Sequence, residues 1–201
     1  MVSETEARQR LVSYFQQFKT FSTVQVSQIA GHFRWRTLDA GTFLVQQGET
    51  TSQIGYVAEG ISWLYYIDRD GTERTKSFCT ENHLVGAYSA MLLSEPSRFY
   101  IRAEVSSALL MITFDMLHTF SETNAIWQSL HLKLVQELFI RKERRESELL
   151  LDDAAERYRK FQEQYPGLEN RVKQYQIASY LGITPVALSR IRARLKPVNL
   201  G

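Results

Sequence analysis

The sequence is poor in cysteine and contains no long apolar run. Only one of its 201 residues is a cysteine, Cys79. A single cysteine excludes an internal disulfide, a four-cysteine zinc site and a cysteine-ligated iron–sulfur cluster. Because no eighteen consecutive residues are apolar, we expect no membrane span. The segment Met1–Glu6 carries acidic residues where a signal peptide is basic and then apolar, so we expect a cytoplasmic protein.

The net charge is small, but the charge is unevenly distributed. Lys plus Arg is 24 and Asp plus Glu is 22, a formal net charge of +2. Residues 1–140 carry 11 basic and 14 acidic side chains, whereas residues 149–201 carry 9 basic and 5 acidic ones. No acidic residue follows Pro185. An acidic body with a basic end favours a polyanionic partner for that end. The alternative is a solvated helix end, where cations are favourable beside the helix dipole.

The spacing of apolar residues in the first 114 residues predicts two short helices followed by many strands. Leu11, Phe15 and Phe18 recur at helical spacing, and a second helical pattern runs from Val26 to Phe33. From there to Phe114 the chain consists of short β-rich runs separated by glycines. Roughly eight strands at 8–12-residue spacing indicate a sandwich, barrel or jelly roll. The clearest strands are 42–45, 54–57, 61–67 and 99–102, with a hairpin turn at 68–71.

After Phe114 the spacing is helical throughout, with a short helix over 115–121 and a long one over 124–148. The long helix is apolar nearly all round, and such a helix usually has more than one partner. We therefore expect one face to pack on the β-rich part and another on a second copy of the chain. A helix buried within a single chain is the alternative. The residues assigned to this dimer helix are Trp127, Leu130, Leu134 and Leu138, and Ile126, Val135 and Phe139 widen the stripe.

Residues 174–191 carry the strongest local signal, which predicts a helix-turn-helix. A preceding helix is capped by Asp152–Asp153 and ends at Pro166–Gly167. In the motif itself Ala178 is small enough for a close helix crossing, and Gly182 allows a left-handed turn. Thr184 is a favourable N-cap for the second helix. The apolar residues that would hold the two helices together are Ile177, Leu181, Ile183, Leu188 and Ile191.

The second helix of this motif is expected to place its N-terminal half in the major groove of DNA. Arg190 would contact guanine or a phosphate, and Thr184 with the helix N-terminus would suit a phosphate oxygen. A helix-turn-helix used for protein contacts is the alternative. The candidate DNA-binding residues are Gln174, Thr184, Pro185, Val186, Ser189, Arg190, Arg192 and Arg194, with Lys196 as a further phosphate contact.

A glycine-punctuated β-roll, a long helix and a C-terminal helix-turn-helix, in this order, resemble the Crp/Fnr family of bacterial transcription regulators. The motifs that carry the resemblance are Gly41, Gln47–Glu49, Val57–Gly60, Asp70–Gly71, Leu84–Gly86 and Leu181–Arg190. The resemblance implies an α+β protein with a cyclic-nucleotide-binding-like β-roll or jelly-roll sensor over 1–123. It further implies a dimerisation helix over 124–148 and a winged helix-turn-helix over 149–201. The implied partners are double-stranded DNA, a second copy of the chain, RNA polymerase and a small-molecule effector.

The sequence departs from the cyclic-AMP binders of that family at two positions. Their cassette glycine is followed by a glutamate, here Ala87, and their cassette proline by an arginine, here Ser97, with Arg98 one residue late. A one-residue slip in a strand turns a side chain to the other face, so we expect no cyclic-AMP binding unless a bulge turns Arg98 back. Tyr88 and Phe99 would make the pocket apolar, which favours a hydrophobic ligand or a filled pocket. The pocket residues implied by the resemblance are Gly86, Ala87, Tyr88, Ser89, Ser97 and Arg98.

Other chemistries find little support in the sequence. No two of the four histidines stand within ten residues of each other, which disfavours a cupin-type metal enzyme. No nucleophile elbow, Walker loop or dinucleotide fingerprint is present. We therefore expect no enzyme activity, no metal and no cofactor. The alternative function is a cyclic-nucleotide- or other small-ligand-binding module that signals through protein contacts.

Overall fold

A computed structural model describes residues 1–18 and 21–195 of the chain. It divides into two units, of which the first comprises 1–66 and 77–138. The second comprises 67–76 together with the chain from Phe139 onward. These units differ from the three consecutive segments expected from the sequence, because the division falls inside the long helix and the second unit includes part of a hairpin. Within the described residues no helix is long and apolar enough to cross a membrane.

The first unit begins with two helices, α1 (Glu4–Gln16) and α2 (Thr23–Gly31), where the apolar spacing predicted them. Ser3 caps α1 by accepting a hydrogen bond from the backbone N–H of Glu6. Ser22 caps α2 and forms a reciprocal capping box with Gln25. Such caps satisfy backbone donors that the first turn of a helix leaves free. The sequence therefore fixes where both helices begin.

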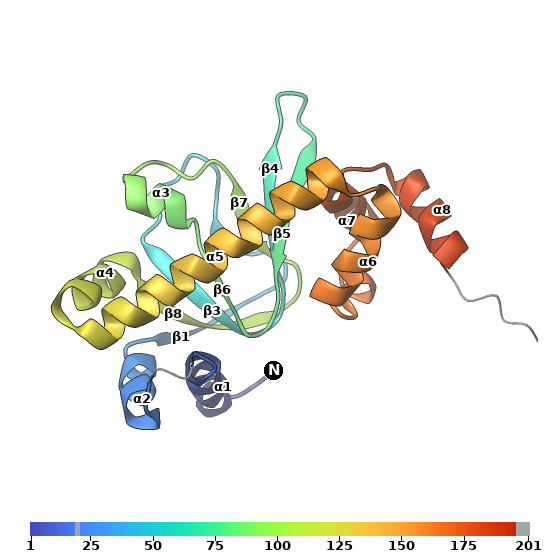
Figure 1. Cartoon of the computed structure of the whole chain (residues 1–201). Helices are drawn as coiled ribbons and strands as arrows, with labels where there is room; N and C mark the ends of the chain where they lie inside the picture. The colour runs from blue at the N-terminus through green and yellow to red at the C-terminus, as the bar shows by residue number, and fades with distance from the viewer. Residues whose placement is uncertain (19–20, 196–201) are drawn as a thin grey trace, which may run out of the picture. The chain divides into compact units, whose positions relative to one another are not determined.

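Eight strands follow and form two four-stranded antiparallel sheets (Figure 1). One sheet has the order β1-β8-β3-β6 and the other the order β2-β7-β4-β5. This arrangement confirms the expected β-roll. Residues 67–76, at the tip of the hairpin formed by β4 and β5, belong to the second unit. The strands are β1 (Arg34–Leu38), β2 (Phe43–Val45), β3 (Gln53–Glu59), β4 (Ser62–Ile67), β5 (Glu73–Cys79), β6 (His83–Val85), β7 (Tyr100–Ala103) and β8 (Ser107–Thr113).

Three helices complete this part of the chain: α3 (Tyr88–Leu93), α4 (Phe114–Thr123) and the long α5 (Ala125–Leu151). In Figure 1, α5 is the long helix coloured from yellow to orange. Trp127 and Leu130 of α5 are buried in a core that they share with α1, α2 and α4. These two residues are therefore not available to a second copy, which corrects their assignment to the dimer seam. Leu134 packs against the same core and is partly buried.

The second unit contains the end of α5, α6 (Ala154–Gln164), a 3-10 turn (Leu168–Asn170), α7 (Gln174–Leu181) and α8 (Pro185–Leu195). Asp153 caps α6 by accepting hydrogen bonds from the N–H groups of Ala155 and Glu156. From Phe139 to Leu195 the described chain has helices but no strand, so the expected wing is not found there. Lys196 and the five residues after it lie outside the described residues.

Candidate functional site

The two helices α7 and α8 are joined by the turn 182–184, whose geometry matches the sequence prediction. Gly182 adopts a left-handed conformation with φ of 69°, and its N–H caps the end of α7. The hydroxyl of Thr184 accepts a hydrogen bond from the N–H of Ala187 at 3.2 Å, as an N-cap should. Ala178 and Leu188 are fully buried where the helices meet. The turn therefore fixes the angle at which α8 leaves α7.

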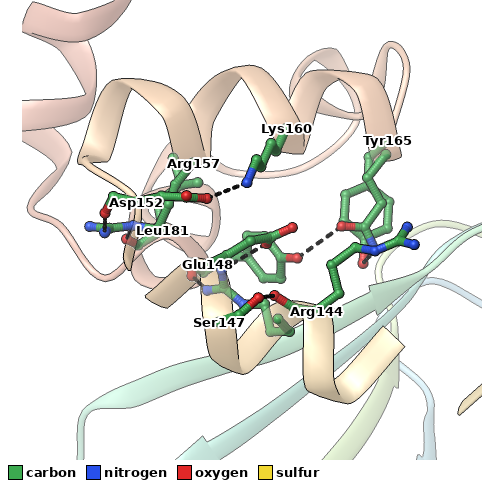
Figure 2. Close-up of polar contacts among 11 residues, drawn as sticks. Arg144, Ser147, Glu148, Asp152, Arg157, Lys160, Tyr165 and Leu181 are labelled. Atoms are coloured by element: carbon green, nitrogen blue, oxygen red, sulfur yellow. Dashed lines mark hydrogen bonds and ion pairs between the residues drawn. The ribbon is translucent and has the colours of Figure 1, made fainter. Parts of the chain in front are cut away.

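Arginines from α5 and α6 bind the carbonyl end of α7. Arg157 donates from Nε to the carbonyl of Leu181 at 2.9 Å, and Arg145 donates to the carbonyl of Tyr180. The Arg145 guanidinium also lies 3.9 Å from the centre of the Tyr180 ring. Figure 2 shows Arg157 beside Leu181, and the ion pair between Lys160 and Asp152. This ion pair, of 2.6 Å, joins α6 to the end of α5. Cations near the C-terminus of a helix stabilise it, so these contacts fix the position of α7, against which α8 packs.

One face of α8 is exposed and basic. Val186 is 61% exposed, and the side chains of Arg190 and Arg194 lie in solvent. Within the described residues neither arginine makes a hydrogen bond or an ion pair, so both guanidinium groups are available to a partner. The candidate residues that the structure leaves exposed here are Thr184, Pro185, Val186, Ser189, Arg190 and Arg194.

Two other candidates from the sequence have structural roles instead. Arg192 donates from Nε to the hydroxyl of Tyr158 at 3.2 Å and lies 3.8 Å from the carboxylate of Glu169. Tyr158 is itself bound to Glu169, at 2.8 Å. Arg192 thus joins α8 to α6, and its contact with a phosphate stays a prediction. Gln174 is exposed and donates to the carbonyl of Pro185 at 3.4 Å, linking the starts of α7 and α8.

The hairpin tip 67–76 contacts the outer side of α7, which the sequence did not indicate. The hydroxyl of Ser179 accepts a hydrogen bond from the N–H of Thr75 at 2.8 Å. The hydroxyl of Tyr175 donates to the carboxylate of Glu73 at 3.1 Å. Because 104 residues separate Thr75 from Ser179, no local pattern could have revealed this pairing.

The pocket residues implied by the resemblance lie partly in the core and partly in solvent. Ala87 is fully buried, and the buried hydroxyl of Ser97 donates to the carbonyl of Phe99 at 2.7 Å. Arg98, between two buried residues, is exposed. Burial raises the pKa of Tyr66, and the neighbouring charge of Arg98 opposes that rise. Arg98 therefore lies on the outside of the roll, and the structure has no bulge that turns it inward.

The interior of the roll is filled by apolar side chains. Ala87 and Phe99 belong to a continuous core together with Val85 and Leu64. Ser89, another predicted pocket residue, is exposed. A hollow of about 220 Å³ lies elsewhere in the first unit and contains none of the predicted pocket residues. Its lining is Thr50, Thr51, Ser52, Ala90, Met91, Ser94, Glu95, Phe114 and Asp115.

Tyr88, the predicted pocket residue at the start of α3, is bound to His131 of α5. Its hydroxyl lies 2.9 Å from Nε2 of His131. Ser121 donates its proton to the carbonyl of Leu117, so it can only accept from Nδ1 of His131, at 3.1 Å. This assigns the histidine proton to Nδ1 and makes Tyr88 the donor to Nε2. Burial and the neighbouring His118 lower the pKa of His131, which favours this neutral form.

Comparison with known proteins identifies the domain that contains the roll. Residues 35–124 match the family model of the cyclic nucleotide-binding domain. This part of the first unit is therefore similar to cyclic nucleotide-binding domains. No curated protein sequence matches the chain. Among the described residues no group of three or more His, Cys, Asp or Glu side chains could hold a metal ion.

Three solved structures are similar to this chain over most of its length. A putative cyclic nucleotide binding protein from Ruegeria pomeroyi is 19% identical, with a TM-score of 0.69 over 96% of this chain and 88% of its own. FixK2 from Bradyrhizobium japonicum is 17% identical, with a TM-score of 0.68 over 81% and 84%. The c-di-GMP responsive global regulator CLP from Xanthomonas campestris is 16% identical, with a TM-score of 0.65 over 87% and 92%. These similarities show a common fold.

Proposed function

We propose that this protein is a homodimeric, sequence-specific DNA-binding transcription regulator of the Crp/Fnr type. The observation that carries the proposal is the exposed basic face of α8, on which Arg190 and Arg194 have no intrachain partner within the described chain. Its supports are the cyclic nucleotide-binding domain and structural neighbours that are regulators of this type. Those neighbours are regulatory proteins rather than enzymes.

In this proposal the N-terminal half of α8 enters the major groove. Arg190 lies in the second turn of α8 and donates to the edge of a guanine, the commonest specific contact in protein–DNA complexes. Thr184 and the free N–H groups at the start of α8 bind a phosphate oxygen, and Arg194 binds a second phosphate further along. Val186 and Pro185 offer apolar contact to a thymine methyl group. Arg192 keeps α8 in position through its contacts with Tyr158 and Glu169.

The second copy of the chain would bind to the apolar face of α5 that the core leaves free. Leu132 and Phe139 are 56% and 65% exposed, and together with Val135 they lie at i, i+3 and i+7 on one face of the helix. A two-fold axis along this face would present two α8 helices to a symmetric DNA site, with half-sites about one helical turn apart. RNA polymerase, the further partner implied by the resemblance, would then act on the DNA-bound dimer.

The effector of this regulator is proposed not to be cyclic AMP. A cyclic phosphate buried in the roll would need a cation and hydrogen-bond donors there. The interior instead holds the apolar groups of Ala87 and Phe99, and Arg98 lies outside. The Tyr88–His131 hydrogen bond joins α3 to α5 without any ligand.

Replacing Arg190 by alanine tests the proposed DNA contact. We expect affinity for a duplex recovered by selection to fall roughly 10- to 100-fold, because one bidentate arginine–guanine contact is worth about 1–3 kcal/mol. Fluorescence anisotropy at two salt concentrations measures the affinity and its salt dependence. Arg159→Ala is the matched control, since it removes an equal charge from an exposed position on α6. Equal losses in both variants, or none in either, would contradict a role of α8 in DNA recognition and favour signalling through protein contacts.

A further inference from the structure

Three cations of the second unit lie near enough to one another that two of them act electrostatically on the third. Lys76 is on β5, and Arg141 and Lys142 are consecutive residues of α5. Lys76 and Arg141 are partly buried, whereas Lys142 is exposed. The cluster belongs to neither the α7–α8 pair nor the predicted roll pocket. It therefore requires an explanation of its own.

The surroundings of Lys76 disfavour the protonated form of its side chain. Burial, together with the charges of Lys142 and Arg141, lowers the pKa of Lys76 to about 8. Desolvation and like charges both disfavour the protonated form of a lysine. An anion bound among the three side chains would favour the protonated form and so raise the pKa again.

A second observation at the same place is an unsatisfied donor. Nε of Arg141 is shielded from solvent and has no hydrogen-bond partner in the structure. Buried donors without a partner are rare in folded proteins because they lose the hydrogen bonds that water would make. A guanidinium presents its N–H groups in a planar fork that matches the oxygens of a phosphate. Arg141 thus offers the kind of donor that a phosphate would accept from.

We propose that Lys76, Arg141 and Lys142 form a binding site for the dianionic phosphate group of a small molecule. The charge of three cations is balanced better by a dianionic phosphate than by a ligand with a single carboxylate. Because two of the three side chains are partly buried, a small ligand fits the site better than the backbone of a DNA duplex. The assignment of this ligand as the effector rests on the proposed regulatory function. Lys76 directly follows Thr75, whose N–H binds Ser179 of α7. A phosphate bound to both β5 and α5 would therefore lie next to the hydrogen bond that joins the hairpin to α7.

Nuclear magnetic resonance of the lysine side chains in the full chain tests the site. The Lys76 signal is assigned by its loss in Lys76→Met, and its pKa is measured without additive, with inorganic phosphate, with adenosine 5′-monophosphate and with adenosine. Sodium chloride matches the ionic strength of the four samples. We expect phosphate, the nucleotide or both to raise the pKa of Lys76 by about one unit or more, as a bound counter-ion does. Adenosine, which has no phosphate, should leave it unchanged.

Lys160 is the internal control because its ammonium is exposed and already paired with Asp152 at 2.6 Å. Its pKa should not respond to any additive. Arg141→Gln should abolish the response of Lys76 while circular dichroism remains that of the folded chain. A Lys76 pKa that is the same in all samples, or an equal shift at Lys160, would overturn the proposal. Either result would leave the Arg190 comparison untouched, so failure of this site is distinguishable from failure of the DNA-binding proposal.

Discussion

Gly60→Ala is expected to destabilise the first unit by about 3 kcal/mol or more, a large fraction of the roughly 5–15 kcal/mol by which ordinary domains are stable. Gly60 joins β3 to β4 with φ of 114°, a region that L residues rarely adopt. A Cβ there would lie 2.5 Å from Cβ and 2.8 Å from Cα of Ser107, and closer still to its hydroxyl. Ser107 is fully buried at the start of β8, and its hydroxyl is bound to the carbonyl of Val105. Neither side of the contact can move without disturbing the sheet.

Urea unfolding followed by circular dichroism measures this loss. Gly71→Ala is the matched control, because Gly71 also has a positive φ, 79°, but nothing within 4 Å of its would-be Cβ. It should lose only the cost of a left-handed alanine, about 1 kcal/mol. Similar losses in the two variants would show that Ser107 does not constrain Gly60.

The second large effect is expected from Phe139→Glu, which should convert the protein into a monomer. In a two-fold interface each glutamate would lie near its symmetry mate, inside an apolar surface that offers no counter-charge. We expect the dimer dissociation constant to rise at least roughly 100-fold, since like charges at an interface cost several kcal/mol. DNA affinity should fall with it, because a monomer contacts only one half-site.

Analytical ultracentrifugation measures the oligomeric state, and circular dichroism checks that folding is retained. Leu93→Glu is the control, because it places the same charge at another exposed apolar residue, on α3 instead of α5. A wild-type chain that is monomeric at micromolar concentration, or a Phe139→Glu dimer as tight as the wild type, would refute the proposed seam. Trp127 is unsuitable for this test because its loss would open the intrachain core.

Local signals in the sequence were sufficient for the positions of most elements. The periodicity of Leu11 and Phe15 located α1, and the capping residues Asp153 and Thr184 located the starts of α6 and α8. Gly182 was predicted to be left-handed and is so. These features depend on neighbours within a few residues, which is the range over which sequence patterns carry physical information.

Features that depend on distant parts of the chain were predicted less well. An apolar stripe shows that Trp127 and Leu130 are buried but does not show against what, so they were assigned to the wrong partner. The sequence around Arg192 does not indicate that Tyr158 and Glu169, which lie far from it along the chain, are its partners. The bond of Tyr88 to His131 and that of Thr75 to Ser179 join residues 43 and 104 positions apart. Only the tertiary structure brings these groups together.

Selection of binding sites from random DNA duplexes by the full-length protein tests the central claim most directly. The account predicts enrichment of a two-fold symmetric sequence whose half-sites lie about 10 base pairs apart, with a guanine in each half-site that Arg190→Ala no longer selects. Enrichment of no symmetric sequence, with binding that does not distinguish selected from random duplexes, would contradict it.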